Sequence, residues 1–329
     1  MEIRDQNELF RLDDRTYLLN FRSGYGLDTL LASGVRSTWG LARFVQRRNH
    51  LSPGAVFLRH GGFACTTFNV FDAAGHPLLA RNFDYKDSPC VVVRTAPADG
   101  YRSIAVADAN LMLYGNGRQQ LSSDTVTMKR LLMAPYACMD GINEAGLSAA
   151  ILEIKAKPTR QRTGKLPLTT SVILRAVLDR CASVEEAEAM FRRFDMRDAL
   201  GCCYHYQIAD AAGNSVILEY CRNKLYVYHP ENRSQWAMNF FLTPGGDNRK
   251  AMGYERETVV RAALEASGGV MDAAAAMKVL SDCVLNYRHR LGWPVRTCWS
   301  AVYDCAEPGM LLCTGENYGR PYRFSVSEQ

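Results

Sequence analysis

The sequence lacks the closely spaced ligand pairs that metal sites use, although 11 of its 329 residues are cysteine. It contains neither a CxxC nor an HExxH motif, and Cys202 and Cys203 are adjacent rather than separated by two residues. We therefore expect no metal. An odd cysteine count in a chain of this length also argues against a disulfide framework and favours reduced thiols in a cytoplasm.

Long apolar runs are also missing. No stretch approaches the length of a membrane span, and the first fifteen residues, MEIRDQNELFRLDDR, are too charged for the apolar part of a secretory signal. The 39 lysines and arginines only slightly outnumber the 34 acidic residues and are mostly scattered. The sequence therefore predicts a cytoplasmic protein without a membrane span and without nucleic-acid binding.

Hydrophobic residues make up 47% of the chain, enough for a large core. In residues 1–64, apolar side chains recur at helical spacing over 27–34 and 37–51, and Ser37 is a candidate N-cap. The sequence SPG at 52–54 then interrupts the pattern. We expect residues 1–64 to form a helical pro-segment.

From residue 65 onward, strands and helices occur in groups. Three segments have the pattern of a strand, a tight turn and a second strand, each with Asp at the turn entry and Gly near its exit. They are 68–83, 205–220 and 300–314. Helical periodicity marks 166–182, 183–194, 254–267 and 271–285. Since few βα units alternate, we expect a single α+β domain over 65–329, with layered antiparallel sheets.

The first hairpin surrounds a cysteine with polar residues. Its returning strand brings Arg81, Asn82 and Asp84 back beside Cys65. Because Arg81 and Asp84 are three residues apart, we expect a bend or bulge between them. A neighbouring guanidinium lowers the pKa of a thiol, so this group fits a cysteine nucleophile better than a buried core thiol.

A nucleophilic cysteine also needs a base, and no histidine follows Cys65 closely. Cleavage of the peptide bond after Ala64 would supply one, because an α-amine has a pKa of about 7.7–8.0 and can activate its own thiol. A papain-like alternative would use His205, although the alternation in YHYQI favours a histidine packed in a strand. Intact mass would separate the two.

The order C-T-x-F, G and R-N-x-D resembles the choloylglycine hydrolase and linear amide C–N hydrolase family of N-terminal-nucleophile enzymes. Arg81 and Asp84 follow Cys65 by sixteen and nineteen residues, as in that family. Further segments resemble the family in order along the chain: YACMDGINEAGLSAA (136–150), CYHYQIADAAGNSVILEY (203–220), WAMNFFLTP (236–244), GYERETVV (253–260) and TCWSAVYDCAEPGMLLCTGEN (297–317).

The resemblance implies an αββα four-layer sandwich and hydrolysis of a linear amide without a metal or organic cofactor. Cys65 would be the nucleophile, and its amine, freed by autocatalytic cleavage, the base. Asp84 would hold the amine and Arg81 would stabilise the thiolate. The resemblance places an oxyanion donor at Asn143 and a bracing charge at Arg256.

Three departures separate the chain from bile salt hydrolases. Those enzymes begin almost at their cysteine, they carry an asparagine where this chain has Gly201 and Cys202, and Met238 replaces the threonine of their T-N pair. We therefore expect a small-molecule N-acyl amide as substrate without assigning the acyl group. Acyl transfer to an amine, a non-enzymatic binding role and homo-oligomerisation stay open.

Overall fold

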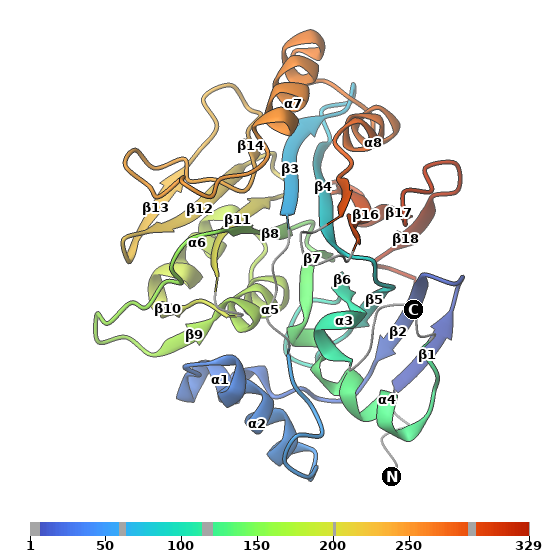
Figure 1. The fold of residues 1–329 in the computed structure, drawn as a ribbon, viewed down its shortest axis with the longest axis vertical. Coiled ribbons are helices and arrows are strands. Elements are labelled where there is room, and N and C mark those ends of the chain that lie inside the picture. The colour runs from blue at the N-terminus through green and yellow to red at the C-terminus, as the bar shows by residue number, and fades with distance from the viewer. Residues whose placement is uncertain (1–6, 59–63, 114–120, 200–201, 289–293, 329) are drawn as a thin grey trace.

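The computed structural model describes residues 7–58, 64–113, 121–199, 202–288 and 294–328. Two large sheets form its centre (Figure 1). The first has nine strands in the order β1 (Asn7–Arg11), β2 (Thr16–Phe21), β5 (Cys90–Thr95), β6 (Ser103–Asp108), β7 (Cys138–Asn143), β8 (Ser148–Ile154), β11 (Cys203–Ala209), β12 (Ser215–Cys221) and β13 (Lys224–Tyr228).

The second sheet contains the cysteine hairpin. Its path is β14 (Trp236–Ala237), β3 (Ala64–Phe71), β4 (Pro77–Lys86), β16 (Pro294–Asp304), β17 (Gly309–Thr314) and β18 (Tyr322–Ser325), with β15 (Asn286–Arg288) also paired to β16. All strand pairs in this sheet are antiparallel. In the first sheet, β2 and β5 are parallel.

All three predicted hairpins are present, as β3–β4, β11–β12 and β16–β17. The local turn chemistry holds the first of them closed, since the carboxylate of Asp72 accepts hydrogen bonds from the backbone nitrogens of Ala74 and His76. The bulge is not where we expected it. The β3–β4 pairing is regular throughout, and the register shift lies in the neighbouring strand, between Thr297 and Trp299 of β16.

Helices cover the outer faces of both sheets. α5 (Thr170–Arg180) packs on β7 and β8, α6 (Val184–Arg193) on β11 and β12, α7 (Tyr254–Ser267) on β3 and β14, and α8 (Ala273–Asp282) on β4 and β16. The result is an α+β sandwich of four layers, αββα, as predicted. In Figure 1, α7 and α8 lie at the top, α6 at the left and α5 near the centre.

The four helices predicted after residue 65 are present, but two are shorter than predicted: α5 begins only at Thr170, and α8 covers Ala273–Asp282 of the predicted 271–285. Ser183 caps α6 by accepting a hydrogen bond from the Glu186 nitrogen, and the Glu186 carboxylate accepts one in return from the Ala182 nitrogen. Before α5, Pro167–Thr169 form a short strand, β9, that pairs with β10 (Asp195–Arg197) instead of extending the helix. Proline lacks the N–H that a helix interior needs.

Residues 1–64 are only partly helical, which corrects the predicted helical pro-segment. Helices α1 (Leu27–Ser33) and α2 (Thr38–Arg48) are present, and Ser37 caps α2. Residues 7–21, however, form β1 and β2, which extend the nine-stranded sheet. The reason is that TYLLNF has an apolar face, and this face is buried at the sheet edge, where Tyr17 and Leu19 are fully buried.

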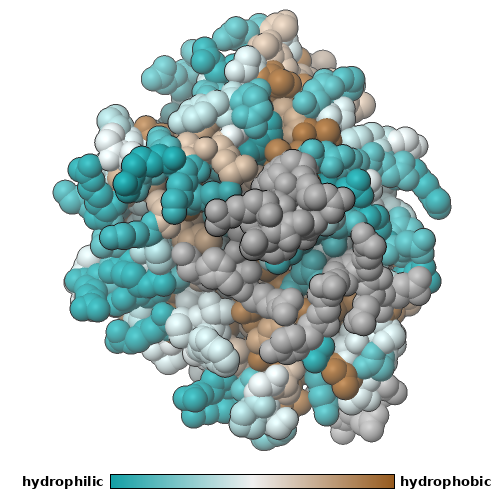
Figure 2. Space-filling view, viewed as in Figure 1, coloured by the Kyte–Doolittle hydropathy of each residue, from teal (hydrophilic) through white to brown (hydrophobic). Residues whose placement is uncertain are grey.

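The remaining helical pieces are short: α3 (Ala109–Met112), α4 (Thr125–Arg130) and the 3₁₀ helix η2 (Leu131–Tyr136). One large hydrophobic cluster occupies the space between the sheets, and a second lies between β3, β4 and the helices α7 and α8. Hydrophobic residues accordingly show only as small separate areas on the face drawn in Figure 2. Among the described residues, none of the helices combines the length and apolar character that crossing a membrane requires.

Candidate active site

The hairpin register decides which side chains share a face with the cysteine. Cys65 lies directly opposite Phe83, and Thr67 lies opposite Arg81. Residues opposite one another in an antiparallel pair point to the same side, and alternate residues along a strand do so too. The Cys65 thiol therefore shares its face with Arg81, whereas Asp84, opposite Ala64, lies on the other face. The three-residue spacing needs no bulge, because the two groups act on opposite sides of one strand.

On the thiol side, Arg81 is completely buried between the sheets. Its Nη2 donates to the carbonyl oxygen of Ile151 at 3.3 Å, and the Cys65 thiol points to the same oxygen at 3.8 Å. Burial raises the pKa of the Cys65 thiol, and the Arg81 charge only partly opposes that rise. We expected Arg81 to lower the thiol pKa. With Ala64 and Cys65 still joined, the desolvation of the sulfur has the larger effect on its pKa.

Asp140 fixes Arg81 in place. Its carboxylate accepts from Nε of Arg81 in a fully buried ion pair and also from Tyr303 and from the Trp299 indole nitrogen. The guanidinium carbon lies 5.0 Å from the centre of the Phe83 ring, which stacks on Trp299. Asp140 is the first residue of the family-like DGINE segment, so the sequence did contain a signal for it.

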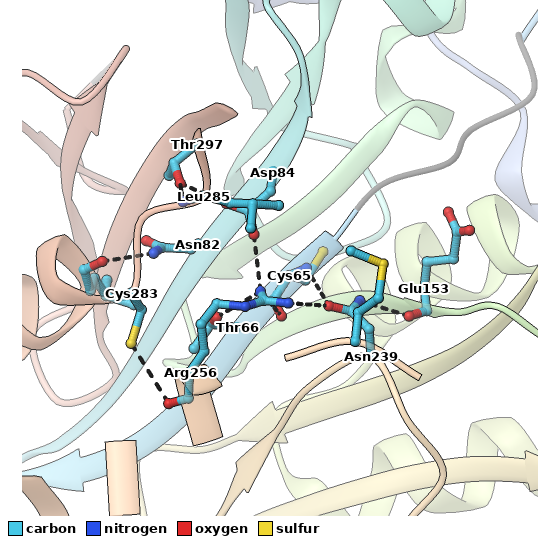
Figure 3. A network of polar contacts seen from close by, with 12 residues as sticks. Cys65, Thr66, Asn82, Asp84, Glu153, Asn239, Arg256, Cys283, Leu285 and Thr297 are labelled. Atoms are coloured by element: carbon cyan, nitrogen blue, oxygen red, sulfur yellow. Dashed lines mark hydrogen bonds and ion pairs between the residues drawn. The ribbon is translucent and has the colours of Figure 1, made fainter. Parts of the chain in front are cut away.

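On the opposite side, polar side chains hold the backbone of Cys65 (Figure 3). The Cys65 nitrogen donates to Oδ1 of Asn239 at 2.8 Å, and its carbonyl oxygen accepts from Nη1 of Arg256 at 2.7 Å. Arg256 also donates to Oδ1 of Asn239 through Nη2, at 2.9 Å. Nδ2 of Asn239 in turn donates to the Glu153 carbonyl oxygen at 2.7 Å. The sequence identified Asn239 only as the remaining half of a T-N pair and gave it no role.

Asp84 belongs to the same cluster without touching the Cys65 nitrogen in the contacts described. Its carboxylate accepts from the Thr297 hydroxyl at 2.7 Å and from Arg256 at 3.0 Å. Burial raises the pKa of Asp84 to about 6, against the opposing effects of Arg256 and Thr297. Three of the other four predicted site residues therefore lie around Cys65: Arg81, Asp84 and Arg256.

Asn143 lies apart from this cluster. Its Nδ2 donates to the carbonyl oxygens of Leu178 and Cys181 at the end of α5, at 3.0 and 2.7 Å. Its Oδ1 accepts from the backbone nitrogens of Ala145 and Leu147 in the turn between β7 and β8. All of these bonds anchor a turn and a helix end, on the side of the nine-stranded sheet that faces the helices.

His205 is paired within the nine-stranded sheet. Its Nε2 hydrogen-bonds to the carboxylate of Glu219 on the adjacent strand, and both side chains are fully buried. Gly201, where the family asparagine is missing, lies outside the described residues. Over the part of the chain that has described positions, no three His, Cys, Asp or Glu side chains gather as a metal site.

The αββα sandwich with its two central sheets is the fold of the N-terminal-nucleophile hydrolases. Within that class, the chain belongs to the linear amide C–N hydrolases, choloylglycine hydrolase family, whose model matches residues 65–238.

Individual proteins resemble this chain in sequence or in fold. Penicillin V acylase of Pectobacterium atrosepticum is 27% identical over 195 residues, which cover 51% of this chain and 47% of that protein. This chain thus aligns with about half the length of that curated relative. A variant of conjugated bile acid hydrolase from Clostridium perfringens shares the fold with a TM-score of 0.55 at 13% identity, covering 80% of this chain and 93% of that one. Penicillin V acylase from Agrobacterium tumefaciens shares the fold with a TM-score of 0.52 at 18% identity. The match covers 79% of this chain and 84% of that one.

Proposed function

We propose that this protein is an autoprocessed cysteine amidohydrolase that cleaves a linear N-acyl amide through a thioester at Cys65. One observation carries the proposal: the backbone nitrogen that would become the catalytic amine already donates to Oδ1 of Asn239 at 2.8 Å. A side chain, in place of a neighbouring strand, holds this nitrogen. After cleavage before Cys65, the new amine would therefore lie within hydrogen-bonding distance of Oδ1 of Asn239.

Autoprocessing uses the thiol on the peptide bond just before it. The Cys65 sulfur attacks the Ala64 carbonyl carbon, the C–S bond forms, and the C–N bond breaks while the nitrogen takes a proton. Water then hydrolyses the resulting thioester and releases the Ala64 carboxylate. Ala64 and Cys65 are both buried in β3, so the reacting groups are held in a fixed geometry.

The catalytic cycle repeats this chemistry on an external amide. The free amine takes the thiol proton, and the thiolate adds to the substrate carbonyl carbon. The tetrahedral intermediate expels the amine leaving group, which takes up the proton, and leaves a thioester on Cys65. Activated by the amine, water then hydrolyses the thioester and regenerates the enzyme. An amine in place of water would make the same thioester an acyltransferase intermediate.

Each charged neighbour has a distinct task in this scheme. Arg81, held by Asp140, stabilises the thiolate from the thiol side. Arg256 holds the Cys65 carbonyl oxygen and bridges Asp84 to Asn239, which keeps the amine oriented. We assign the holding of the amine to Asn239 directly and to Asp84 through Arg256. The oxyanion role of Asn143 would require its amide to leave the end of α5.

The family acts on linear amides, and we propose the acyl part of the substrate as follows. A linear amide with an apolar acyl arm fits a nucleophile between two apolar-lined sheets. The relatives are named for penicillin V and for conjugated bile acids, so both belong in the first substrate panel together with N-acyl amino acids.

Intact mass spectrometry of the purified chain tests the proposal. We expect two fragments, with the larger one beginning at Cys65, and hydrolysis of at least one panel amide by the cleaved form. An uncleaved chain that turns over an amide would instead favour the papain-like version with His205. A chain that is neither cleaved nor active would support a binding protein built on the same fold.

A further inference from the structure

Positive charge is strongly segregated in this chain. Residues 34–48 and 155–165 contain nine of the 39 lysines and arginines and none of the 34 acidic residues. The rest of the chain holds 30 basic and 34 acidic residues and is acidic overall, despite the net charge of +5. The two basic segments are more than a hundred residues apart in sequence, so only the fold can bring them together.

The fold joins the two segments through β9. The backbone nitrogen of Val35 donates to the carbonyl oxygen of Pro167 at 2.7 Å, which places Arg36 beside the end of the second segment. On the other side of β9, β10 ends at Arg197, which forms a backbone bridge with Arg160. Burial lowers the pKa of Arg197, and the charges of Arg162, Arg36 and Arg160 lower it further, as expected where cations crowd together.

The outer face of α2, which begins two residues after Arg36, is also basic. Trp39, Arg43 and Arg47 are spaced by four residues and are all exposed, whereas Leu41, Ala42 and Val45 are buried against the protein. Trp39 is 81% exposed, which is unusual for a side chain of its size. At the other end, Leu166 beside Pro167 is 43% exposed.

The one carboxylate recorded as acting on these arginines from within the described residues is the buried Asp198, because the charge of Arg160 opposes the rise in its pKa. Among residues with described positions, none of Arg36, Arg43, Arg47, Arg160 and Arg162 forms an ion pair with a carboxylate. Exposed arginines elsewhere in the chain commonly do, for example Arg22 with Glu8 and Arg249 with Asp247. A cationic region without exposed ion pairs of its own attracts a polyanion.

We propose that this docking surface, formed by Arg36, Trp39, Arg43, Arg47, Arg160 and Arg162, binds the anionic headgroups of a lipid bilayer. A tryptophan among arginines suits the membrane interface, because the ring lies at headgroup level while the guanidinium groups meet the lipid phosphates. The exposed Leu166 adds apolar area that a lipid surface can bury and a nucleic-acid backbone cannot. Docking is reversible and electrostatic, and it does not involve insertion of any helix among the described residues, since none is long and apolar enough to cross the bilayer.

Co-sedimentation of the full chain with vesicles tests the proposal. We expect binding to vesicles of phosphatidylcholine with phosphatidylserine, little binding to phosphatidylcholine alone, and loss of binding in high salt. The double variant Arg43→Gln, Arg47→Gln should bind roughly 25-fold more weakly, at about fivefold for each charge near an anionic surface. The matched control Arg249→Gln, Arg320→Gln removes two exposed arginines elsewhere and should bind as the original does.

Trp39→Ala distinguishes a bilayer from other polyanions. It should weaken vesicle binding severalfold and leave the retention on a heparin column unchanged. The proposal is overturned if anionic vesicles are not bound, or if both arginine pairs matter equally. It is also overturned if single-stranded RNA is bound as tightly as vesicles and independently of Trp39, which would make the surface a general polyanion site.

Discussion

The side chain of Asn239 accepts a hydrogen bond from the backbone nitrogen of Cys65, across 174 residues of sequence. The same oxygen accepts a second hydrogen bond from Arg256, so it links the Cys65 nitrogen to the Arg256 guanidinium. The strand β14 pairs with β3 only at Trp236 and Ala237, and the chain then leaves the sheet. Asn239 lies where the next backbone hydrogen bond between β14 and β3 would form. Its side chain therefore accepts from the Cys65 nitrogen in place of a backbone carbonyl group.

Asn239→Ala should therefore slow both autoprocessing and amide hydrolysis. The variant leaves the Cys65 nitrogen without its acceptor, and the amine loses the group that orients it. We expect a loss of about 10²-fold, at the low end of what a positioned general base contributes. Rates of fragment appearance by mass spectrometry and of amide turnover give the measurement. Processing at the original rate would contradict the assignment.

Asn143→Ala should behave differently. It removes two hydrogen bonds to the end of α5 and two in the β7–β8 turn. Since buried carbonyl groups then lack donors, we expect the free energy of unfolding to fall by about 1–3 kcal/mol. Turnover by the folded fraction should stay near the original value. A loss of several hundredfold in kcat with unchanged stability would instead restore Asn143 as the oxyanion donor.

Replacing the sulfur separates the two uses of Cys65. Cys65→Ala should give a single uncleaved chain without activity, because nothing remains to attack the Ala64 carbonyl. Cys65→Ser should be cleaved slowly and retain little hydrolysis, since the hydroxyl is the weaker nucleophile. Intact mass after prolonged incubation, followed by the amide panel, decides the matter. An active Cys65→Ala protein would eliminate the mechanism.

The segment before the cut should remain bound after cleavage. β2 forms a parallel ladder with β5, Tyr17 and Leu19 are fully buried, and the Tyr25 hydroxyl donates to Asp179 at 2.6 Å. None of these contacts depends on the bond after Ala64. We expect both fragments to co-elute in gel filtration and to separate only in denaturant. The uncleaved Cys65→Ala chain is the size control, and elution of an active large fragment by itself would refute this.

Stability should depend on pH through Asp108, a buried carboxylate outside the cluster around Cys65. Burial raises its pKa to about 7, and one of its oxygens lacks a hydrogen-bond partner among the described residues. The unfolded chain loses this proton near pH 4 and the folded chain near pH 7. Between these values the folded state binds more protons, so the contribution of Asp108 to the free energy of unfolding falls as pH rises.

Asp108→Asn should therefore leave stability unchanged near pH 4 and raise it at pH 8 by at most about 4 kcal/mol, the equivalent of a three-unit shift. Asparagine preserves the N-cap, since Asp108 accepts from the Asn110 nitrogen through one oxygen. Urea unfolding at the two pH values measures the effect. Asp124→Asn is the matched control, because Asp124 caps α4 in solvent and hydrogen bonds from Ser122 and Thr127 lower its pKa. Equal responses in the two variants would rule out burial as the cause.

Much of the fold was predictable because its signals are local. Alternating residues with Asp and Gly at the turns predict the hairpin that carries Cys65, and the register then determines which face Arg81 shares with it. The capping pair Ser183 and Glu186 predicts the start of α6 in the same way. β1 and β2 were missed, because a short apolar run such as TYLLNF takes its conformation from the sheet edge that it completes.

By itself, the sequence determined the cysteine hairpin, its charged neighbours and the family, since each depends on residues close together or in a set order. Tertiary structure alone decided that the amide of Asn239 meets the Cys65 nitrogen while that of Asn143 caps a helix end. It also decided that burial outweighs Arg81 in setting the thiol pKa. Long-range contacts and desolvation depend on which distant segments pack together, and no local pattern encodes that.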